Sequence, residues 1–353
     1  MQWRDELTRR FPALRRLGPG CYVVGGAIRD LLLGREPADA DVACNDPLAA
    51  AKKVRDRVIR LGDQEHLSAY RVVDHFAGGE HVYDFAELLD HDIDADLARR
   101  DFTINAMAVD LDRDALLDPH GGQRDLEIRT VRMVQASNFD DDPLRTLKGV
   151  RMAVKYGMEL DAETLAAIRL RAARIAEVAT ERVTYELSVI FSAGALRRAI
   201  ALLDQTGLAE PLGLTVREVQ AGDVSLAAAY ALLVGSPRAY GERWRWSEAL
   251  IREVLTLQRL VREHDRLALY DAGEKIARQL PPLLRALGED DALDWPDFSL
   301  RPLLAGEEIA ALTGLPPGKD LGRVKRELLE AQIRGEVATR RDAEGFARQR
   351  GGR

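Results

Sequence analysis

The sequence predicts an α+β protein in which a mixed-sheet head is followed by an all-α remainder. Strand-like and helix-like segments alternate up to about residue 134, beginning with an apolar β-branched run at 22–24. Beyond Asp142 the strand signals nearly vanish, and one helical pattern follows another to the end of the chain. Mixed elements followed by helices alone are typical of an α+β head joined to a separate helical body.

Composition sets the broad class. The chain has 353 residues, of which 46% are hydrophobic and 31% are charged, which is ordinary for a soluble globular protein of two to four domains. No apolar run is long enough to span a membrane, and the charged N-terminus has no signal core. Cys21 and Cys44 cannot build a disulfide framework or a zinc site alone, so we expect free thiols and a cytoplasmic protein.

The net charge of −7 argues weakly against nucleic-acid binding, because phosphate contacts need lysine and arginine. Local charge differs from this global value. Arginine clusters are present in the helical remainder and indicate either a basic track or solvated helix faces: Arg169, Arg171 and Arg174; Arg197 and Arg198; Arg238, Arg243 and Arg245; and Arg340, Arg341, Arg348, Arg350 and Arg353.

A strand, two glycines and a helix start predict a phosphate cradle near the N-terminus. Gly25 and Gly26 follow the strand at 22–24 and precede a helix that ends at Gly34. Glycines let the backbone approach a phosphate closely, and the first amides of the helix point at it. Arg29 could hold phosphate oxygens. Asp30 is alternatively a first-turn carboxylate that the helix dipole favours, and the glycine pair alternatively makes an ordinary tight turn.

Asp39 and Asp41 lie on the next predicted strand. Their spacing of two places both carboxylates on the same face. Two carboxylates beside a phosphate cradle suit a pair of magnesium ions. The alternative is a solvated acidic loop.

The chain then predicts a helix and a hairpin. Asp46 caps a helix expected to run to Leu61, and strands at 69–76 and 80–85 are separated by glycines at 78–79. Asp84 on the second strand could approach the two carboxylates of the preceding strand, and its role is left open.

The string RRDFTINAMA, residues 99–108, precedes an apolar run. Taken alone, Arg100 and Asp101 would form a salt-bridged turn, with Asn105 as a cap. The stretch 116–134, with its Asp-Pro, Gly-Gly and Asp-Leu pairs, is predicted to be structural.

The first helix of the all-α remainder carries a basic stripe. Asp142 is its expected N-cap, with Pro143 at the first helical position. Basic residues then recur at helical spacing on one face: Arg145, Lys148, Arg151 and Lys155. The alternative interpretation is a solvated basic face.

Together these strings resemble the class II tRNA nucleotidyltransferases and bacterial poly(A) polymerases, a group of the polymerase-beta-like nucleotidyltransferases. The matching strings are GGAIRD, DAD, RRDFTINAMA, DDPLRTLKGVR and TERVTYELSVIF. The resemblance implies a catalytic head at 1–137, a helical neck with the base-recognition helix at 138–215, and a tRNA-binding helical body and tail at 216–353.

The resemblance also implies the site. Asp39 and Asp41 would be catalytic and bind Mg²⁺, and CTP and ATP would be the substrates that extend a tRNA. The residues implied for nucleotide binding are Gly25, Gly26, Arg29, Asp30, Arg100, Asp101, Asn105, Asp142, Arg145, Lys148 and Arg151. Within this set, Arg100, Asp101 and Asn105 would organise the nucleotide and its ribose. Asp142 and Arg145 would read the base, while Lys148 and Arg151 would hold phosphates or brace the site.

Two departures from the family bear on specificity. Lys148 stands where the family has arginine, and the segment between Asp84 and Arg99 is shorter than in relatives. Relatives carry a flexible loop there that is linked to switching from C to A, so the sequence favours addition of two cytidines only. We expect the acidic residues at 90–96 to be solvated and extended. Full CCA addition, A addition, poly(A) tailing and a non-catalytic RNA- or nucleotide-binding protein stay as alternatives, and the oligomeric state is not predicted.

Overall fold

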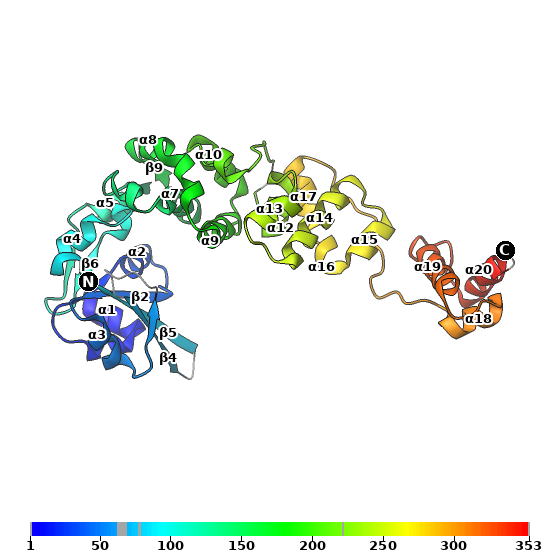
Figure 1. The fold of residues 1–353 in the computed structure, drawn as a ribbon, viewed down its shortest axis with the longest axis horizontal. Helices are drawn as coiled ribbons and strands as arrows, with labels where there is room; N and C mark the ends of the chain where they lie inside the picture. Colours follow the sequence, from blue (N-terminus) through cyan, green and yellow to red (C-terminus); the bar gives the residue numbers. More distant parts are fainter. Residues whose placement is uncertain (1, 62–68, 77–78, 221, 352–353) are drawn as a thin grey trace. The chain divides into compact units, whose positions relative to one another are not determined.

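The computed structural model describes residues 2–61, 69–76, 79–220 and 222–351, which belong to two compact units (Figure 1). The first unit contains residues 1–190 and 201–212, and the second contains residues 191–200 and 213–353. The finer division into head, neck and body stays a prediction.

The head of the first unit is a seven-stranded mixed sheet, as the sequence predicts. Its strands are β1 (Cys21–Val24), β2 (Asp39–Cys44), β3 (Ile59–Leu61), β4 (Ala69–Phe76), β5 (Gly79–Glu87), β6 (Ala108–Asp110) and β7 (Ala115–Leu117). The spatial order is β3-β4-β5-β2-β1-β6-β7, and only β2 and β5 run parallel to each other.

Both faces of the sheet are covered. On one face the Phe11 ring meets the ring of Tyr83 edge-on, and α1 (Trp3–Arg10) and α3 (Pro47–Val54) belong to this layer. On the other face, Val24, Ala43 and Ala108 form a cluster with Leu97 of α4 (Ile93–Ala98). Helix α2 (Gly26–Leu32) connects β1 to β2. These two layers fix β1 and β2, the strands that carry the predicted cradle and carboxylates.

Two local expectations are wrong. The helix predicted to reach Leu61 ends at Val54, because the backbone becomes extended at Arg55 and the segment Ile59–Leu61 pairs with β4 as an edge strand. The acidic segment at 90–96 is not extended throughout either, although Asp90, Asp92 and Asp94 are exposed as expected. Helix α4 forms there, since Asp92 caps its first turn and Asp96 is buried against arginines. The hairpin of β4 and β5 is confirmed, with its residues 77–78 outside the described ones.

The rest of the first unit is mainly helical. It contains α5 (Gly122–Glu127), α6 (Asn138–Asp141), α7 (Leu144–Tyr156), α8 (Ala162–Arg171), α9 (Thr180–Phe191) except its last residue, the second half of α10 (Leu196–Gln205) and α11 (Ala209–Leu212), with a two-stranded ladder of β8 (Thr130–Val131) and β9 (Glu159–Leu160). Helix α7 packs closely against the head at Gly149. A Cβ there would lie 3.1 Å from Phe102 Cζ and 3.0 Å from Ile168 Cδ1.

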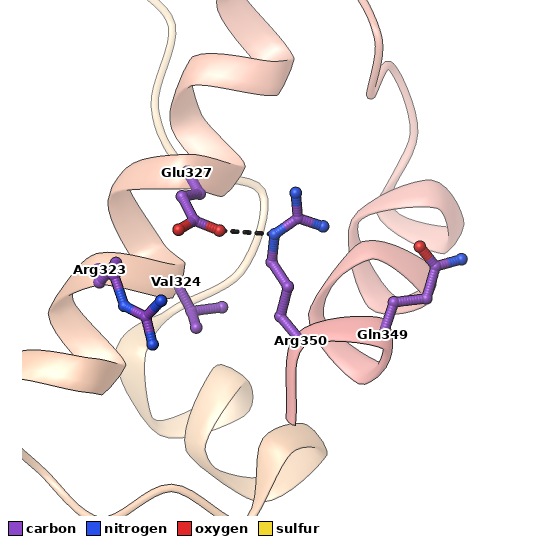
Figure 2. Close-up of a pocket in the computed structure, with 5 residues that line it drawn as sticks. All are labelled: Arg323, Val324, Glu327, Gln349 and Arg350. Carbon is purple, nitrogen blue, oxygen red and sulfur yellow. Dashed lines mark hydrogen bonds and ion pairs between the residues drawn. The ribbon is translucent and has the colours of Figure 1, made fainter. Parts of the chain in front are cut away.

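All elements described between 213 and 351 are helices, which completes the predicted α+β architecture. They are α12 (Leu226–Leu233), α13 (Pro237–Arg243), α14 (Glu248–Arg262), α15 (Arg266–Ala272), α16 (Glu274–Ala277), α17 (Leu280–Leu287), α18 (Gly306–Thr313), α19 (Lys319–Ile333) and α20 (Arg340–Gly351). The last three share a core around Ile309 and Leu328. Figure 2 shows a polar cavity of this region, where Arg350 Nε donates to Glu327 Oε2 at 2.6 Å. Among the described residues, no helix is long and apolar enough to cross a membrane.

Candidate active site

The glycine pair lies where the sequence predicts the cradle. Strand β1 ends at Val24, Gly25 has a positive φ of 71°, and α2 begins at Gly26. A side chain cannot replace the hydrogen at Gly25 without strain, because a Cβ would lie 2.9 Å from Arg100 Nη1. The same Cβ position is 3.9 Å from Asp41 Oδ2. Gly25 therefore brings the cradle against both a predicted metal ligand and a predicted nucleotide-binding arginine.

Asp39 and Asp41 open strand β2 and share one face of it. Burial raises the pKa of Asp39, with a further contribution from Asp84. Burial, followed by the charge of Asp39, raises the pKa of Asp41 to about 6. Across the described residues, neither carboxylate accepts a hydrogen bond or forms an ion pair.

Such a pair fits a divalent cation, because two crowded carboxylates whose pKa values are raised are stabilised by further positive charge. A ready-made cluster of three or more His, Cys, Asp or Glu ligands is not found in the part of the chain that the structure describes. The site therefore offers two carboxylates, and a bound metal ion would need further ligands from substrate or water.

Asp84 is the obvious third carboxylate, since it lies opposite Asp41 in the parallel β2–β5 ladder. Its two oxygens, however, accept from Arg71 Nε at 2.7 Å and from Arg71 Nη2 at 2.6 Å. This two-pronged ion pair engages both carboxylate oxygens of Asp84.

Arg100 is held by a carboxylate that the sequence analysis assigned to solvent. Asp96 is 1% exposed, and its Oδ2 accepts from Arg100 Nη2 at 2.9 Å while Oδ1 accepts from Arg99 Nε at 3.0 Å. Burial alone would raise the pKa of Asp96, but Arg100 and Arg99 outweigh it and lower the pKa. The signal was present in the sequence, because Asp96 stands three and four positions before the two arginines.

Arg29 is committed to protein partners. It is 7% exposed, and it donates to Asp30 Oδ1 at 2.9 Å and to Asn105 Oδ1 at 2.6 Å. Asn105 in turn donates to Asp101 Oδ1 at 3.0 Å. Tyr156 of α7 completes the chain of contacts, with its hydroxyl 3.0 Å from Asp30 Oδ1 and its ring 4.6 Å from the Arg29 guanidinium carbon. These contacts make Arg29 a brace between α2 and α7 in this structure.

The start of α7 lies one residue later than predicted. Asp142 Oδ1 accepts from the Leu144 backbone N–H at 3.3 Å, and Pro143 takes the N-cap position. Asp142 Oδ2 accepts from Arg182 Nη2 at 2.8 Å. Burial would raise the pKa of Asp142, but the bond to Arg182 helps to lower it below its usual value. The ionised form of this carboxylate is therefore favoured just before the start of α7.

Some side chains of the basic stripe on α7 bind other groups of the protein, and one faces a cavity. Arg145 Nη1 donates to the carbonyl oxygens of Arg99 at 2.7 Å and Asn138 at 3.1 Å. Arg151 forms an ion pair of 2.5 Å with Glu186. Lys148 instead lines a cavity of about 370 Å³, together with residues of α7 and α9: Leu144, Glu181, Arg182, Tyr185 and Glu186.

The residues of α9 that line this cavity are not among the site residues predicted from the sequence. Tyr185 and Glu186 follow Arg182 by three and four positions, so both lie on the same helix face as Arg182, and Tyr185 is 64% exposed despite its large aromatic ring. That spacing within TERVTYELSVIF was the available signal. Only tertiary structure shows that this face meets Lys148.

Comparison with known proteins gives the family. Residues 21–132 match the Poly A polymerase head domain, and residues 157–215 match the probable RNA and SrmB-binding site of polymerase A. The A-adding tRNA nucleotidyltransferase of Deinococcus radiodurans is 31% identical, over 97% of this chain and 98% of that protein. The CC-adding tRNA nucleotidyltransferase of Geobacter sulfurreducens is 33% identical, over 94% of this chain and 92% of that protein. The chain belongs to the tRNA nucleotidyltransferase and poly(A) polymerase family.

The fold of this nucleotidyltransferase is also that of solved family members. The Bacillus stearothermophilus CCA-adding enzyme, in complex with CTP, aligns with a TM-score of 0.75 at 23% identity, covering 98% of this chain and 97% of that one. The relatives named thus add A, CC or CCA, so similarity alone does not select a specificity for this chain. Nucleotidyltransferases of this kind generally use a divalent metal ion, in keeping with the carboxylate pair on β2.

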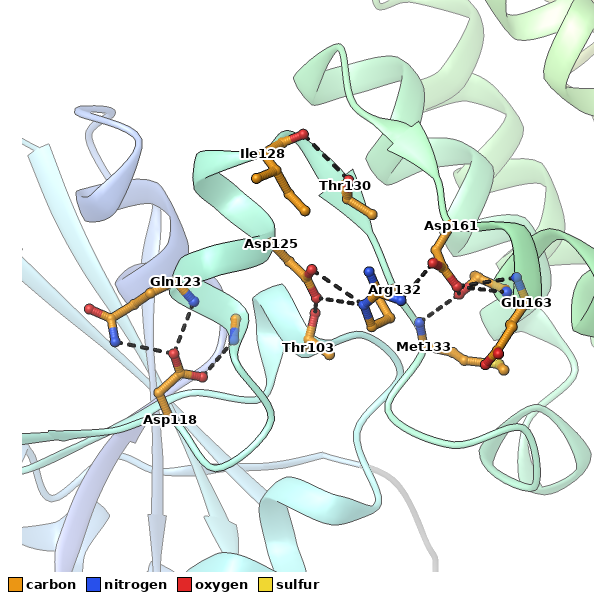
Figure 3. A network of polar contacts seen from close by, with 12 residues as sticks. Thr103, Asp118, Gln123, Asp125, Ile128, Thr130, Arg132, Met133, Asp161 and Glu163 are labelled. Atoms are coloured by element: carbon orange, nitrogen blue, oxygen red, sulfur yellow. Dashed lines mark hydrogen bonds and ion pairs between the residues drawn. The ribbon is translucent and has the colours of Figure 1, made fainter.

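A second polar network in the nucleotidyltransferase is structural, as predicted for 116–134 (Figure 3). Asp118 accepts from the backbone N–H groups of Gly122 and Gln123 at the start of α5, at 2.6 and 3.0 Å. Arg132 joins Asp125 at 3.2 Å to Asp161 at 2.6 Å. Because Asp161 also caps α8, this network connects the head to the helices that follow it.

Proposed function

We propose that this nucleotidyltransferase adds cytidine from CTP to the 3′ end of tRNA, with release of pyrophosphate and with Mg²⁺ as its metal ion. The observation that carries the proposal is the crowded carboxylate pair Asp39–Asp41, whose pKa values are both raised, beside Gly25 and Arg100. When bound there, Mg²⁺ would activate the terminal ribose hydroxyl and neutralise the triphosphate. The protein's own contribution is mainly positioning and charge.

Each group of residues has a distinct task in this proposal. The carboxylates of Asp39 and Asp41 hold the metal, and the backbone at Gly25 and Gly26 receives phosphate. Arg100, oriented by Asp96, adds positive charge next to Asp41. Arg29, Asp30, Asn105 and Asp101 keep the cradle in place through their hydrogen-bonded chain.

We further propose that base selection belongs to Asp142 and Arg145 at the start of α7. Arg145 uses only Nη1 in the described hydrogen-bond network, so Nε and Nη2 are available to a base. Asp142 is held ionised by Arg182 and can still accept from an exocyclic amine, since a carboxylate accepts several hydrogen bonds. Lys148 and Arg182 face the adjacent cavity and supply positive charge there.

Addition is proposed to stop after two cytidines. The segment between Asp84 and Arg99 is short, and α4 occupies its second half. Its end is fixed by Asn138, whose side chain donates to the carbonyl oxygens of Ala98 at 2.9 Å and Arg100 at 2.7 Å. A segment fixed in this way is not suited to the movement that would enlarge the base pocket to admit A.

The test is to size the products of a tRNA that ends at its discriminator base. With CTP, or with CTP plus ATP, we expect extension by two nucleotides and no more. Efficient appearance of a third nucleotide with both substrates would contradict the stop and indicate CCA addition. Extension of a tRNA already ending in CC by ATP alone would indicate A addition, long tails would indicate poly(A) synthesis, and no extension at all would indicate a binding protein.

The proposal also covers the domain division, the role of Asp84 and the cellular compartment. The head is taken as 1–137, the neck as 138–215, and the body and tail as 216–353, with tRNA contacts in the last part. Asp84 is assigned to Arg71 rather than to the metal. The compartment is proposed to be the cytoplasm, where a tRNA substrate and free thiols are expected.

A further inference from the structure

The only two cysteines of the chain lie directly opposite each other in the head sheet. Cys21 begins β1, Cys44 ends β2, and the antiparallel register pairs them. Both are free thiols and both are buried, with exposed fractions of 6% and 3%. The proposed chemistry of nucleotide addition uses neither.

The backbone geometry of the pair suits a covalent bond. The Cys21 carbonyl accepts from Leu111 N–H next to β6, and the Cys44 carbonyl accepts from Leu88 N–H next to β5. The backbone polar groups of both cysteines therefore point away from each other, so the pair is a non-hydrogen-bonded one. In such pairs the Cα atoms are about 4.5 Å apart and the side chains approach most closely. Disulfides form at Cα separations of about 4.4–6.8 Å.

The surroundings favour reaction between the thiols. The pKa of Cys21 is lowered first by the Cys44 thiol and also by Lys53, whereas the Cys21 thiol and burial raise the pKa of Cys44, so Cys21 is the thiol that ionises more readily. The pair also stands at the ends of its two strands, where local opening costs least.

We propose that Cys21 and Cys44 are an oxidisable dithiol that closes a cross-strand disulfide and staples the catalytic unit. With hydrogen peroxide as oxidant, one thiolate sulfur attacks a peroxide oxygen and becomes a sulfenic acid as the O–O bond breaks; the departing hydroxide takes up the proton that the thiol released and leaves as water. The second thiol then attacks that sulfur, the S–S bond forms, and a second water leaves. The two thiols lose two electrons in total, and the peroxide gains them.

The loop that the disulfide would close contains the predicted phosphate cradle and the predicted metal ligands. Residues 22–43 lie between the cysteines and include Gly25 and Gly26 together with Asp39 and Asp41. Because the side chains of a strand alternate, Cys44 points to the opposite face of β2 from Asp41. The disulfide would thus hold the cradle and the carboxylates on one closed loop without occupying their face.

The experiment compares the full chain after treatment with hydrogen peroxide and after treatment with a dithiol reductant. The protein is then unfolded and alkylated. We expect two labels per chain in the reduced protein and none in the oxidised protein, with a mass lower by the two thiol hydrogens and no dimer. We also expect the thermal midpoint to rise by about 3 °C or more on oxidation, since closing a loop of this length restricts the unfolded chain.

Cys21→Ala and Cys44→Ala are the matched controls, each compared with itself in both redox states so that any loss of stability by the substitution cancels. Neither variant should gain stability on oxidation, and each should keep nucleotide incorporation after a heat challenge equally in both states. The wild-type chain should keep more incorporation when oxidised. The proposal is overturned if the peroxide-treated wild type retains two alkylatable thiols, advances to sulfinic acids, or pairs between chains instead.

Discussion

At the scale of single residues, the ionised carboxylates of the two β2 aspartates destabilise the folded state. Asp39 and Asp41 share a half-buried face, and burial is the main cause that raises the pKa of each. Nearby arginines such as Arg71 lower both pKa values but do not outweigh burial, and no ion pair to either aspartate is found among the described residues. A fold selected for stability alone would pair or replace such groups. Unfavourable charge of this kind is typical of sites that bind a positively charged ligand.

Replacing either aspartate should abolish nucleotide incorporation. Asp39→Ala and Asp41→Ala each remove a metal ligand, and each should lower the rate by about a thousandfold or more, equivalent to several kcal/mol of transition-state stabilisation. Asp94→Ala is the control, because Asp94 is an exposed carboxylate on α4 of the same head. The measurement is incorporation of labelled CTP into tRNA. A double variant with near wild-type incorporation would contradict the metal-site assignment.

The raised pKa of Asp41 predicts a pH-dependent stability. Folding raises this pKa from 3.8 to about 6, so the ionised carboxylate destabilises the fold. The destabilisation is absent below about pH 4, where the group is protonated in both states, and complete above pH 6. Asp41→Asn should therefore raise the thermal midpoint at pH 8, by the equivalent of on the order of 1 kcal/mol, and this gain should shrink to nothing near pH 4.

Magnesium supplies the check on this interpretation. Above pH 6, the metal should raise the thermal midpoint of the wild-type chain more than that of Asp41→Asn, because only the wild type offers both carboxylates. A stability gain in the variant that is equal at pH 4 and pH 8 would mean that the charge of Asp41 is not its cause.

At the scale of elements, α7 contacts the head at both of its ends. Its Tyr156 contacts Asp30 on α2, and its Arg145 holds the carbonyl of Arg99 in the RRD string. A helix fixed at both ends in this way can present Asp142 and Arg145 in constant positions, which reading a base requires.

Arg145→Ala should weaken the selection of CTP over ATP, UTP and GTP more than it weakens triphosphate binding. Buried hydrogen-bonding groups reject wrong bases by leaving donors or acceptors unpaired, and selection is lost with them. The measurement is kcat/KM for each nucleotide. Lys155→Ala is the control, because Lys155 is exposed near the other end of the same helix. Uniform loss of affinity with an unchanged C preference would make Arg145 a structural or phosphate-binding residue.

Helices and strands that have a clear periodicity or turn residues in the sequence were predictable, but the residues at which they end were not. The strand before Gly25, the hairpin of β4 and β5, and the helix at Leu144 follow from periodicity and turn residues. Helix α3 was predicted too long, because its sequence continues to suit a helix after Val54 while the edge of the sheet offers β4 as a hydrogen-bonding partner. Tertiary hydrogen bonds overrode local propensity there.

At the scale of the whole molecule, the contacts that define the site join residues far apart in the chain. Asp142 meets Arg182, Tyr156 meets Asp30, and Arg29 meets Asn105. The motifs indicated most of these residues, but spacing could not show which arginines are already paired within the protein. Consequently Arg29 was predicted to hold phosphate, whereas the structure shows it buried among protein acceptors.

The same distinction between paired and unpaired arginines applies to the tRNA contacts that we propose for residues 216–353. Arg340 forms an ion pair with Glu308, and Arg350 with Glu327. For Arg341, which is exposed, the described residues provide no ion-pair partner. A paired arginine must give up its carboxylate before it can contact phosphate, so abundant arginine in an acidic chain does not by itself make a basic track.

Arg341→Ala should therefore weaken tRNA binding more than Arg340→Ala does. An unpaired arginine can neutralise a tRNA phosphate directly, so its loss should raise KM for tRNA and reduce the salt dependence of binding by about one ion. KM for CTP should not change in either variant, because the triphosphate is assigned to the head. The measurement is tRNA affinity at two or more salt concentrations, together with KM for both substrates. Equal salt slopes in Arg341→Ala and wild type would remove Arg341 from the tRNA path, and a larger loss in Arg340→Ala would mean that the Glu308 pair opens on binding.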